Sequence, residues 1–199
     1  MSAPPGPVPQ TDLTLLARRA LAEVQRVFDA VPTDVPSAFV EEVLAAGRVA
    51  LYGVGREGLT MRGLAMRLYH AGIQASVVGD MSAPPVAAGD LLIVSAGPGG
   101  FSTVDALLGV ARAAGARTLL FTAQPHGSAA RLADRVLTVP ARTMADDHAG
   151  ATTTAPPTLP MGSLYELSLW LLGDLLIAQL AARQNLSPEQ LCARHTNLE

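Results

Sequence analysis

The chain has 199 residues, of which 49% are hydrophobic and 16% are charged, and its formal net charge at pH 7 is −3. This length and composition are typical of one folded domain with a sizeable core and exclude a disordered chain. The sequence contains no lysine, so it excludes chemistry that needs a Schiff-base or phosphate-loop lysine. It also has no basic run of the kind that binds nucleic acid. The single Cys192 permits no disulfide within the chain and no multi-cysteine metal site, which favours a cytoplasmic protein.

The N-terminal quarter reads as a tail followed by helices. Residues 1–10 have neither the basic nor the apolar stretch of a signal peptide, so a disordered tail is expected there. Apolar residues at helical spacing then predict helices over residues 12–31 and 37–46. We expect these helices, within residues 11–47, to pack on the domain that follows.

From residue 48 onward, short β-branched runs alternate with helical segments. The runs are apolar throughout, which indicates strands that are buried on both faces of a parallel sheet. We therefore predict that residues 48–199 form one α/β domain with a doubly wound, five-stranded parallel sheet, with ligands at the carboxyl ends of the strands. The predicted strands are 49–52, 75–78, 91–94, 118–121 and 136–139, and the helices between them include 57–71 and 103–114.

The last third of the chain is expected to hold a loop and a long helix. Residues 143–159 are polar and rich in Thr, Ala and Pro, which suggests a lid or an inter-subunit loop. The helix predicted from about Ser163 to Gln184 is apolar, but an aspartate at mid-bilayer costs about 2.5–3.5 kcal/mol, so Asp174 argues against a membrane span. We expect a helix buried at a subunit interface, where Asp174 finds a polar partner. A final helix opens at Ser187 with a capping box completed by Gln190.

A glycine-rich turn joins the first strand of the domain to a helix. Gly53, Gly55 and Gly58 match the dinucleotide-binding pattern, with Asp80 at 22 residues beyond the last glycine. Two other interpretations fit the same residues. The turn needs glycine for its backbone alone, or the helix N-terminus at Gly55, together with Arg56, faces an anionic substrate.

The third predicted strand ends in a loop of small residues. Its hydroxyls and backbone amides predict an anion site, with Ser95, Ser102 and Thr103 as candidate ligands. Alternatively, Ser102 or Thr103 caps the following helix, with Asp105 in the first turn. The two roles can coexist, because one hydroxyl can cap the helix while the others face the ligand.

Three further side chains are candidates on their residue type. Glu166 follows Ser163 by three residues, and this spacing alone favours the acidic half of a capping box. His195 lies at the end of the last helix, where a histidine usually interacts with the helix dipole. His148 lies in the acidic part of the polar loop, but the spacing of the residues around it does not support a metal site.

Several segments occur in an order that resembles one family. They are Gly53-Val-Gly-Arg-Glu-Gly58, Ala65-Met-Arg-Leu-Tyr-His70, Val77-Val-Gly-Asp80, Gly89-Asp-Leu91, Pro160-Met-Gly-Ser-Leu-Tyr-Glu166 and Arg194-His-Thr-Asn-Leu-Glu199, of which the last two are the most specific. From about Arg48 to Glu199 the chain is similar to the 6-phospho-3-hexuloisomerases, a branch of the sugar isomerase (SIS) domain superfamily.

The resemblance implies a flavodoxin-like five-stranded sheet and a homotetramer with composite active sites, and we expect a homodimer or a homotetramer. It also implies isomerisation of a sugar phosphate, of the type 3-hexulose 6-phosphate to fructose 6-phosphate, through an enediol and without metal or organic cofactor. By position, Glu166 corresponds to the base, His195 to an acid–base partner from a neighbouring subunit, and Arg56 to a group that holds the charged substrate. A buried carboxylate and an imidazole suit these proton transfers.

The loop after the third strand departs from the family pattern. The family usually has Ser-Gly-Ser-Gly-Glu-Thr, whereas this chain has Ser95-Ala-Gly-Pro-Gly-Gly-Phe101, so that Gly97 stands where a hydroxyl is expected. The departure motivates one alternative to the isomerase, a non-catalytic module that binds a sugar phosphate. The three glycines and Asp80 motivate a second alternative, a nicotinamide dinucleotide-binding protein.

Overall fold

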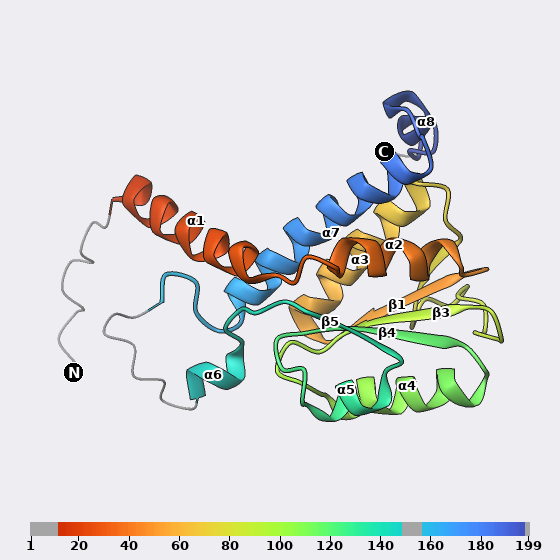
Figure 1. Ribbon diagram of the computed structural model, residues 1–199, viewed down its shortest axis with the longest axis horizontal. Helices are drawn as coiled ribbons and strands as arrows, with labels where there is room; N and C mark the ends of the chain where they lie inside the picture. Colours follow the sequence, from red (N-terminus) through yellow and green to blue (C-terminus); the bar gives the residue numbers. More distant parts are fainter. Residues whose placement is uncertain (1–11, 149–156, 198–199) are drawn as a thin grey trace, which may run out of the picture.

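The computed structural model describes residues 12–148 and 157–197. The predicted tail, and part of the predicted loop at 143–159, lie outside these residues. The chain forms a five-stranded parallel sheet in the order β2-β1-β3-β4-β5, with helices on both faces (Figure 1). The strands are β1 (Val49–Gly53), β2 (Ala75–Val77), β3 (Leu91–Ser95), β4 (Arg117–Thr122) and β5 (Arg135–Thr138). The helices are α1 (Leu13–Ala30), α2 (Val35–Leu44), α3 (Gly55–His70), α4 (Ser102–Ala113), α5 (Ser128–Leu132), α6 (Met144–His148), α7 (Ser163–Arg183) and α8 (Pro188–Cys192).

The central strand β3 divides the core into two layers. Its five residues are all buried. Because successive side chains of a strand point to opposite faces, Leu91 and Ile93 enter one apolar cluster, and Leu92 and Val94 enter another. Helices α1, α2, α3 and α7 cover the first face and α4 and α5 the second (Figure 1). Burial on both faces explains the apolar runs in the sequence, and the predicted doubly wound α/β fold is confirmed.

The strand order reverses next to β1, and this reversal sets the place of the site. β1 lies between β2 and β3, so the crossovers that leave β1 and β3 run to opposite faces of the sheet. A crevice therefore opens beyond the carboxyl ends of these two strands, where open α/β sheets bind ligands. Helix α3 begins at this crevice directly after β1, and α4 begins there after the β3–α4 loop.

Helix α7 is a core element. By length and composition alone it could cross a membrane, but 56% of its apolar window is buried inside the chain. Its buried residues, including Leu169, Leu172 and Leu176, join the cluster on the face of the sheet that carries α3. Asp174 does find the polar partner that was expected, but the partner is in the same chain: its Oδ1 lies 2.9 Å from Nε of Arg67 on α3.

The predicted elements lie within two residues of the observed ones, with two omissions. Helices α5 and α6 were not predicted, because five residues are too few to show a helical period. Helix α6 lies inside the segment that was expected to be loop. The capping box of α8 is confirmed: Ser187 Oγ accepts from the Gln190 amide at 3.3 Å, and Gln190 Oε1 accepts from the Ser187 amide at 2.8 Å.

Candidate active site

The turn between β1 and α3 needs glycine for structural reasons. Gly55 has φ +58°, which disfavours other residues. A Cβ on Gly58 would lie 2.5 Å from the carbonyl oxygen of Gly53, so the end of β1 and the start of α3 approach too closely for a side chain. The tight-turn interpretation thus accounts for all three glycines of the dinucleotide pattern. Asp80, the fourth part of that pattern, forms a surface ion pair with Arg62 at 3.1 Å.

A cavity of about 440 Å³ lies at the crevice, and we call it the switch-point cavity. The start of α3, the β3–α4 loop, the start of α6 and the segment from Pro160 to Glu166 form its walls. Its lining residues are Val54, Gly55, Arg56, Glu57, Pro98, Phe101, Thr143, Met144, Pro160, Met161, Gly162, Ser163, Tyr165 and Glu166. The cavity therefore combines apolar walls with one arginine and two carboxyls, as expected for a small-molecule site.

Glu166 is held by Arg56 and not by a helix cap. The expected capping box of Ser163 and Glu166 is wrong, because the N-cap of α7 is Gly162, which makes no side-chain cap hydrogen bond. Ser163 Oγ instead accepts from Nη1 of Arg56 at 3.0 Å, and the same nitrogen lies 2.9 Å from Oε2 of Glu166. The left-handed conformations of Met161 (φ 55°) and Gly162 (φ 78°) turn the chain into α7 so that its first turn meets that of α3.

The environment of Glu166 suits a general base. Its side chain is 14% exposed. Burial raises the pKa of the carboxyl, and the neighbouring Arg56 guanidinium offsets part of that rise. A carboxylate with a raised pKa is more basic than an exposed one, as the transfer of a carbon-bound proton requires.

A second carboxyl, that of Glu57, lines the same cavity and was not predicted as a site residue from the sequence. Glu57 Oε2 accepts from Ser95 Oγ at 2.5 Å, and the Gly97 amide donates to the same carboxyl at 3.0 Å and 3.2 Å. The Tyr165 hydroxyl lies 3.1 Å from Ser95 Oγ. Burial raises the pKa of Glu57, hydrogen bonds from Ser95 and Gly97 lower it, and the charge of Glu166 raises it further. One feature of the sequence could have pointed to this residue: Glu57 lies between Gly55 and Gly58, inside the glycine-rich turn.

The three hydroxyls expected to bind phosphate lie in different environments. Ser95 is fully buried and donates to Glu57. Ser102 and Thr103 are exposed in the first turn of α4 and lie outside the residues that line the cavity. The expectation that one of them caps α4 is wrong, because the N-cap is Phe101 and no side-chain cap hydrogen bond forms.

His195 lies far from Glu166 within one chain. Its ring is 5.3 Å from the ring of His70, at the C-terminal end of α3, and Nη1 of Arg194 donates to the His70 carbonyl at 3.1 Å. Glu166 contacts Arg56 at the N-terminal end of the same helix. The 16 residues of α3 span about 24 Å at roughly 1.5 Å per residue. The structure thus brings Glu166, Arg56 and Gly55 together and leaves His195 at the opposite end.

Metal ligands do not cluster within residues 12–148 and 157–197, where no group of three or more His, Cys, Asp or Glu side chains could hold an ion. Asp146, near the start of the predicted lid loop, instead accepts from the amide and hydroxyl of Thr143 at 2.7 Å and 2.9 Å. These hydrogen bonds of the Asp146 carboxylate stabilise the turn at the start of α6.

The fold and the site define a doubly wound α/β protein whose switch-point cavity carries a partly buried carboxyl paired with an arginine. The chain belongs to the SIS domain family, whose pattern matches residues 42–167. It is 37% identical to a 3-hexulose-6-phosphate isomerase of Mycobacterium gastri over 158 residues, which cover 79% of this chain and 77% of that one. It is 40% identical to a protein of the same name from Methylomonas aminofaciens over 156 residues, covering 78% and 82%.

Solved structures share the fold. A Methanococcus jannaschii protein, whose crystal structure was described as inferring a function of 3-hexulose-6-phosphate isomerase, matches with a TM-score of 0.77 and 24% identity over 94% of this chain and 98% of that one. The Vibrio vulnificus NanR protein complexed with ManNAc-6P matches with a TM-score of 0.69 and 23% identity, covering 93% and 66%.

Proposed function

We propose that this protein is a sugar-phosphate isomerase that interconverts 3-hexulose 6-phosphate and fructose 6-phosphate. The observation that carries the proposal is the partly buried Glu166 carboxyl, paired with Arg56 in the switch-point cavity. Relatives named 3-hexulose-6-phosphate isomerase, at 37% and 40% identity over most of both chains, support this substrate class.

In the proposed reaction a proton and a carbonyl group exchange places on neighbouring carbons. Glu166 removes the proton from C2 of 3-hexulose 6-phosphate, which forms a 2,3-enediol, and returns it to C3. The hydroxyl proton passes from O2 to O3, which leaves the carbonyl at C2 of fructose 6-phosphate. No electrons enter or leave the substrate, so the step needs no redox cofactor. Arg56 balances the charge of Glu166 and faces the anionic substrate.

We also propose that a second copy completes the site with its C-terminal segment. His195 and Glu166 of one chain lie at opposite ends of α3. If His195 is the acid–base partner of Glu166, it must therefore come from another subunit. The single free thiol, Cys192, supports the further proposal of a cytoplasmic protein.

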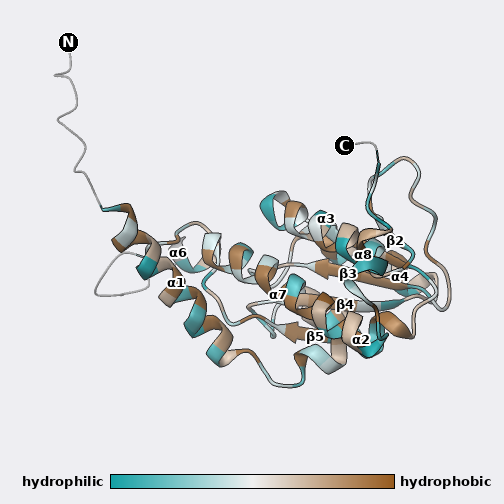
Figure 2. Cartoon of the chain, turned by 90° about the horizontal axis from the view of Figure 1, so that it is seen from above, coloured by the Kyte–Doolittle hydropathy of each residue, from teal (hydrophilic) through white to brown (hydrophobic). Residues whose placement is uncertain are grey.

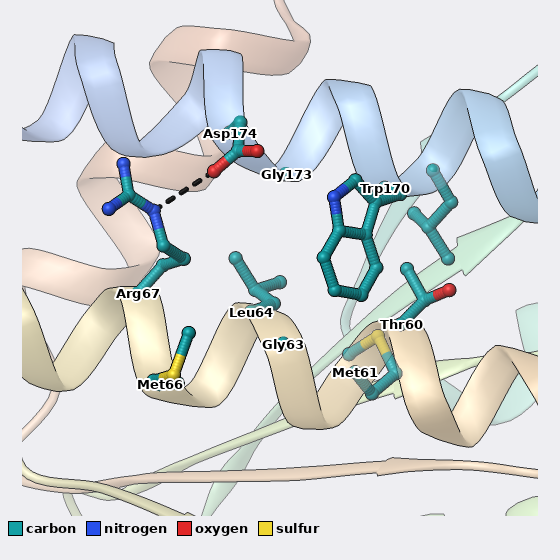
Figure 3. Close-up of a pocket in the computed structure, with 10 residues that line it drawn as sticks. Thr60, Met61, Gly63, Leu64, Met66, Arg67, Trp170, Gly173 and Asp174 are labelled. Atoms are coloured by element: carbon teal, nitrogen blue, oxygen red, sulfur yellow. Dashed lines mark hydrogen bonds and ion pairs between the residues drawn. The ribbon is translucent and has the colours of Figure 1, made fainter. Parts of the chain in front are cut away.

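The face that the second copy covers in this proposal lies over α3 and α7. A cavity of about 320 Å³ separates these helices, with Trp170 against Gly63 at one end and the ion pair of Arg67 and Asp174 at the other (Figure 3). Large apolar side chains are exposed around it: Leu59, Met66 and Tyr69 on α3, and Leu167, Trp170, Leu171 and Leu175 on α7. Leu13, Leu15 and Leu21 on α1 are also exposed, and this helix projects away from the sheet and the helices that cover it (Figure 2). Apolar surface of this extent is typical of an interface.

The decisive experiment is an isomerase assay with 3-hexulose 6-phosphate, generated enzymatically, and fructose 6-phosphate as the product. Wild-type protein is expected to turn over, and Glu166→Gln to lose turnover by at least 100-fold, since general-base catalysis contributes about 10²–10⁴-fold. Glu41→Gln, on the exposed side of α2, is the matched control and should keep full activity. Turnover retained in Glu166→Gln would exclude this carboxyl as the base.

One alternative rests on a specific observation. The altered β3–α4 loop fits a non-catalytic module that binds a sugar phosphate, and the NanR structure indicates that this fold can hold such a ligand. Such a module predicts that fructose 6-phosphate raises the melting temperature although the wild-type protein has no turnover.

A further inference from the structure

The end of β3 and the β3–α4 loop supply two hydrogen-bond donors that bind the side chain of Glu57. The Ser95 hydroxyl and the Gly97 amide both donate to the Glu57 carboxyl. Ser95 is fully buried and Glu57 is 7% exposed, so water does not compete for these contacts. The loop thus already binds one carboxyl group.

The donors used in this way are not free for a ligand. A serine hydroxyl has one proton to donate, and a backbone amide has one. A phosphate ester that entered this part of the loop would meet neither of these protons while Glu57 holds them. It would also lie beside the Glu57 carboxylate, and like charges in a shared buried site repel strongly.

Close packing fixes this arrangement. A Cβ on Gly97 would lie 2.8 Å from ring carbons of Tyr165 and 3.1 Å from Oε1 of Glu57. The loop therefore has no room at position 97 for a further hydroxyl that could compensate. Tyr165 is itself buried and contacts Ser95, so the ring holds the carboxyl and the loop together.

Arg56 lies on the open side of the same cavity. Its side chain is 61% exposed, and among the described residues that line the cavity it is the one cation. A guanidinium binds a phosphate ester through two parallel hydrogen bonds. Nη1 of Arg56 already contacts Glu166 and Ser163, so a ligand would bind through the other N–H groups of the guanidinium. The charge distribution across the cavity therefore runs from the buried Glu57 to the exposed Arg56, paired with Glu166.

We propose that Glu57 is a specificity-determining residue: it fills the anion-binding part of the β3–α4 loop, so that a phosphate ester is held through Arg56 and not through Ser95 and Gly97. The proposal takes its ligand class, a phosphate ester, from the proposed function and adds where the phosphate binds. In this proposal the buried Ser95 hydroxyl binds Glu57 and does not contact the substrate.

Calorimetry with inorganic phosphate, and then with fructose 6-phosphate, tests this assignment. Arg56→Gln should weaken phosphate binding about tenfold or more, and Glu57→Gln, which removes the like charge, should strengthen it about tenfold. Ser95→Ala should change the affinity less than threefold, because we place its hydroxyl on Glu57. Asp90→Asn is the control: this buried carboxylate binds Arg48 and the Ala87 amide, away from the cavity, so affinity should not change.

Two results would overturn the proposal. One is a loss in Ser95→Ala as large as that in Arg56→Gln, which would place the phosphate on the loop. The other is a phosphate affinity of Glu57→Gln that equals or falls below that of the wild type. Absence of phosphate binding in both the wild type and Glu57→Gln counts as this second result. If Glu57→Gln does not fold, the comparison of Arg56→Gln with Ser95→Ala still decides. Because binding is measured without turnover, failure of the isomerase proposal would appear separately, in the activity assay.

Discussion

The ring of Tyr165 and the carboxyl of Glu57 leave no space for a side chain at position 97. Gly97→Ala should therefore lower the free energy of unfolding by about 1–3 kcal/mol, the usual cost of an extra methyl group in a packed interior. Urea unfolding followed by circular dichroism measures the change. Gly109→Ala is a matched control, because a Cβ on this residue of α4 meets nothing within 4 Å. It should raise stability by about 0.5–1 kcal/mol, and equal effects of the two substitutions would contradict the packing argument.

The pKa of Glu166 should depend on Arg56. Burial raises this pKa and the guanidinium lowers it, so Arg56→Gln should raise it further. A base acts only when ionised, and activity is lost as pH falls through its pKa. The acid limb of kcat/KM against pH should therefore move to higher pH in the variant. Arg62→Gln, which loses only the exposed pair with Asp80, should leave the limb in place. A limb that moves to lower pH in Arg56→Gln would exclude Glu166 as the titrating base.

At the scale of elements, α1 supports the cavity from outside the sheet. Glu23 on α1 accepts from the amides of Thr158 and Leu159 at 2.9 Å and 3.3 Å. These residues lead into the segment that holds Met161 in a left-handed conformation before α7 begins. A hydrogen bond to a charged group contributes about 1.5–3 kcal/mol, so Glu23 can maintain a conformation that Met161 alone disfavours.

Glu23→Ala should consequently affect catalysis as well as stability. We expect kcat/KM to fall several-fold, because the segment that leads to Glu166 loses its anchor, and the melting temperature to fall as well. Steady-state kinetics together with thermal unfolding measure both effects. Glu41→Ala, at an exposed position of α2, is the control. Unchanged kinetics in Glu23→Ala would exclude a contribution of Glu23 to catalysis and leave α1 with a role in packing alone.

At the scale of the whole molecule, composite sites predict complementation between inactive variants. Glu166→Gln and His195→Ala should each be inactive alone. After unfolding and refolding as an equal mixture, about half of the dimers should be mixed, each with one intact site, so that about one quarter of wild-type activity returns. Light scattering should show at least a dimer. No recovery in mixed dimers of confirmed composition would exclude His195 as a residue supplied by the partner.

Most of the fold could be predicted because its signals are local. The apolar run of β3 indicated a strand that is covered on both faces, and Gly72 and Gly115 marked where helices stop, each with a positive φ. The site was predictable only in part. Glu166 and Arg56 were predicted as site residues and both line the switch-point cavity, whereas Glu57 was not predicted, because its hydrogen bonds depend on partners that lie 38 and 40 residues away in the sequence.

The sequence by itself therefore determined the strands, the long helices and the α/β class, because periodicity and apolar runs act over a few neighbouring residues. Only the tertiary structure decided the charge arrangement of the cavity. The register of β1 against β3, with Gly53 opposite Ser95, brings the start of α3 under the β3–α4 loop and turns Ser95 toward Glu57. The tertiary structure also separated His195 from Glu166, since the length of α3 keeps the C-terminal segment away from the cavity of its own chain.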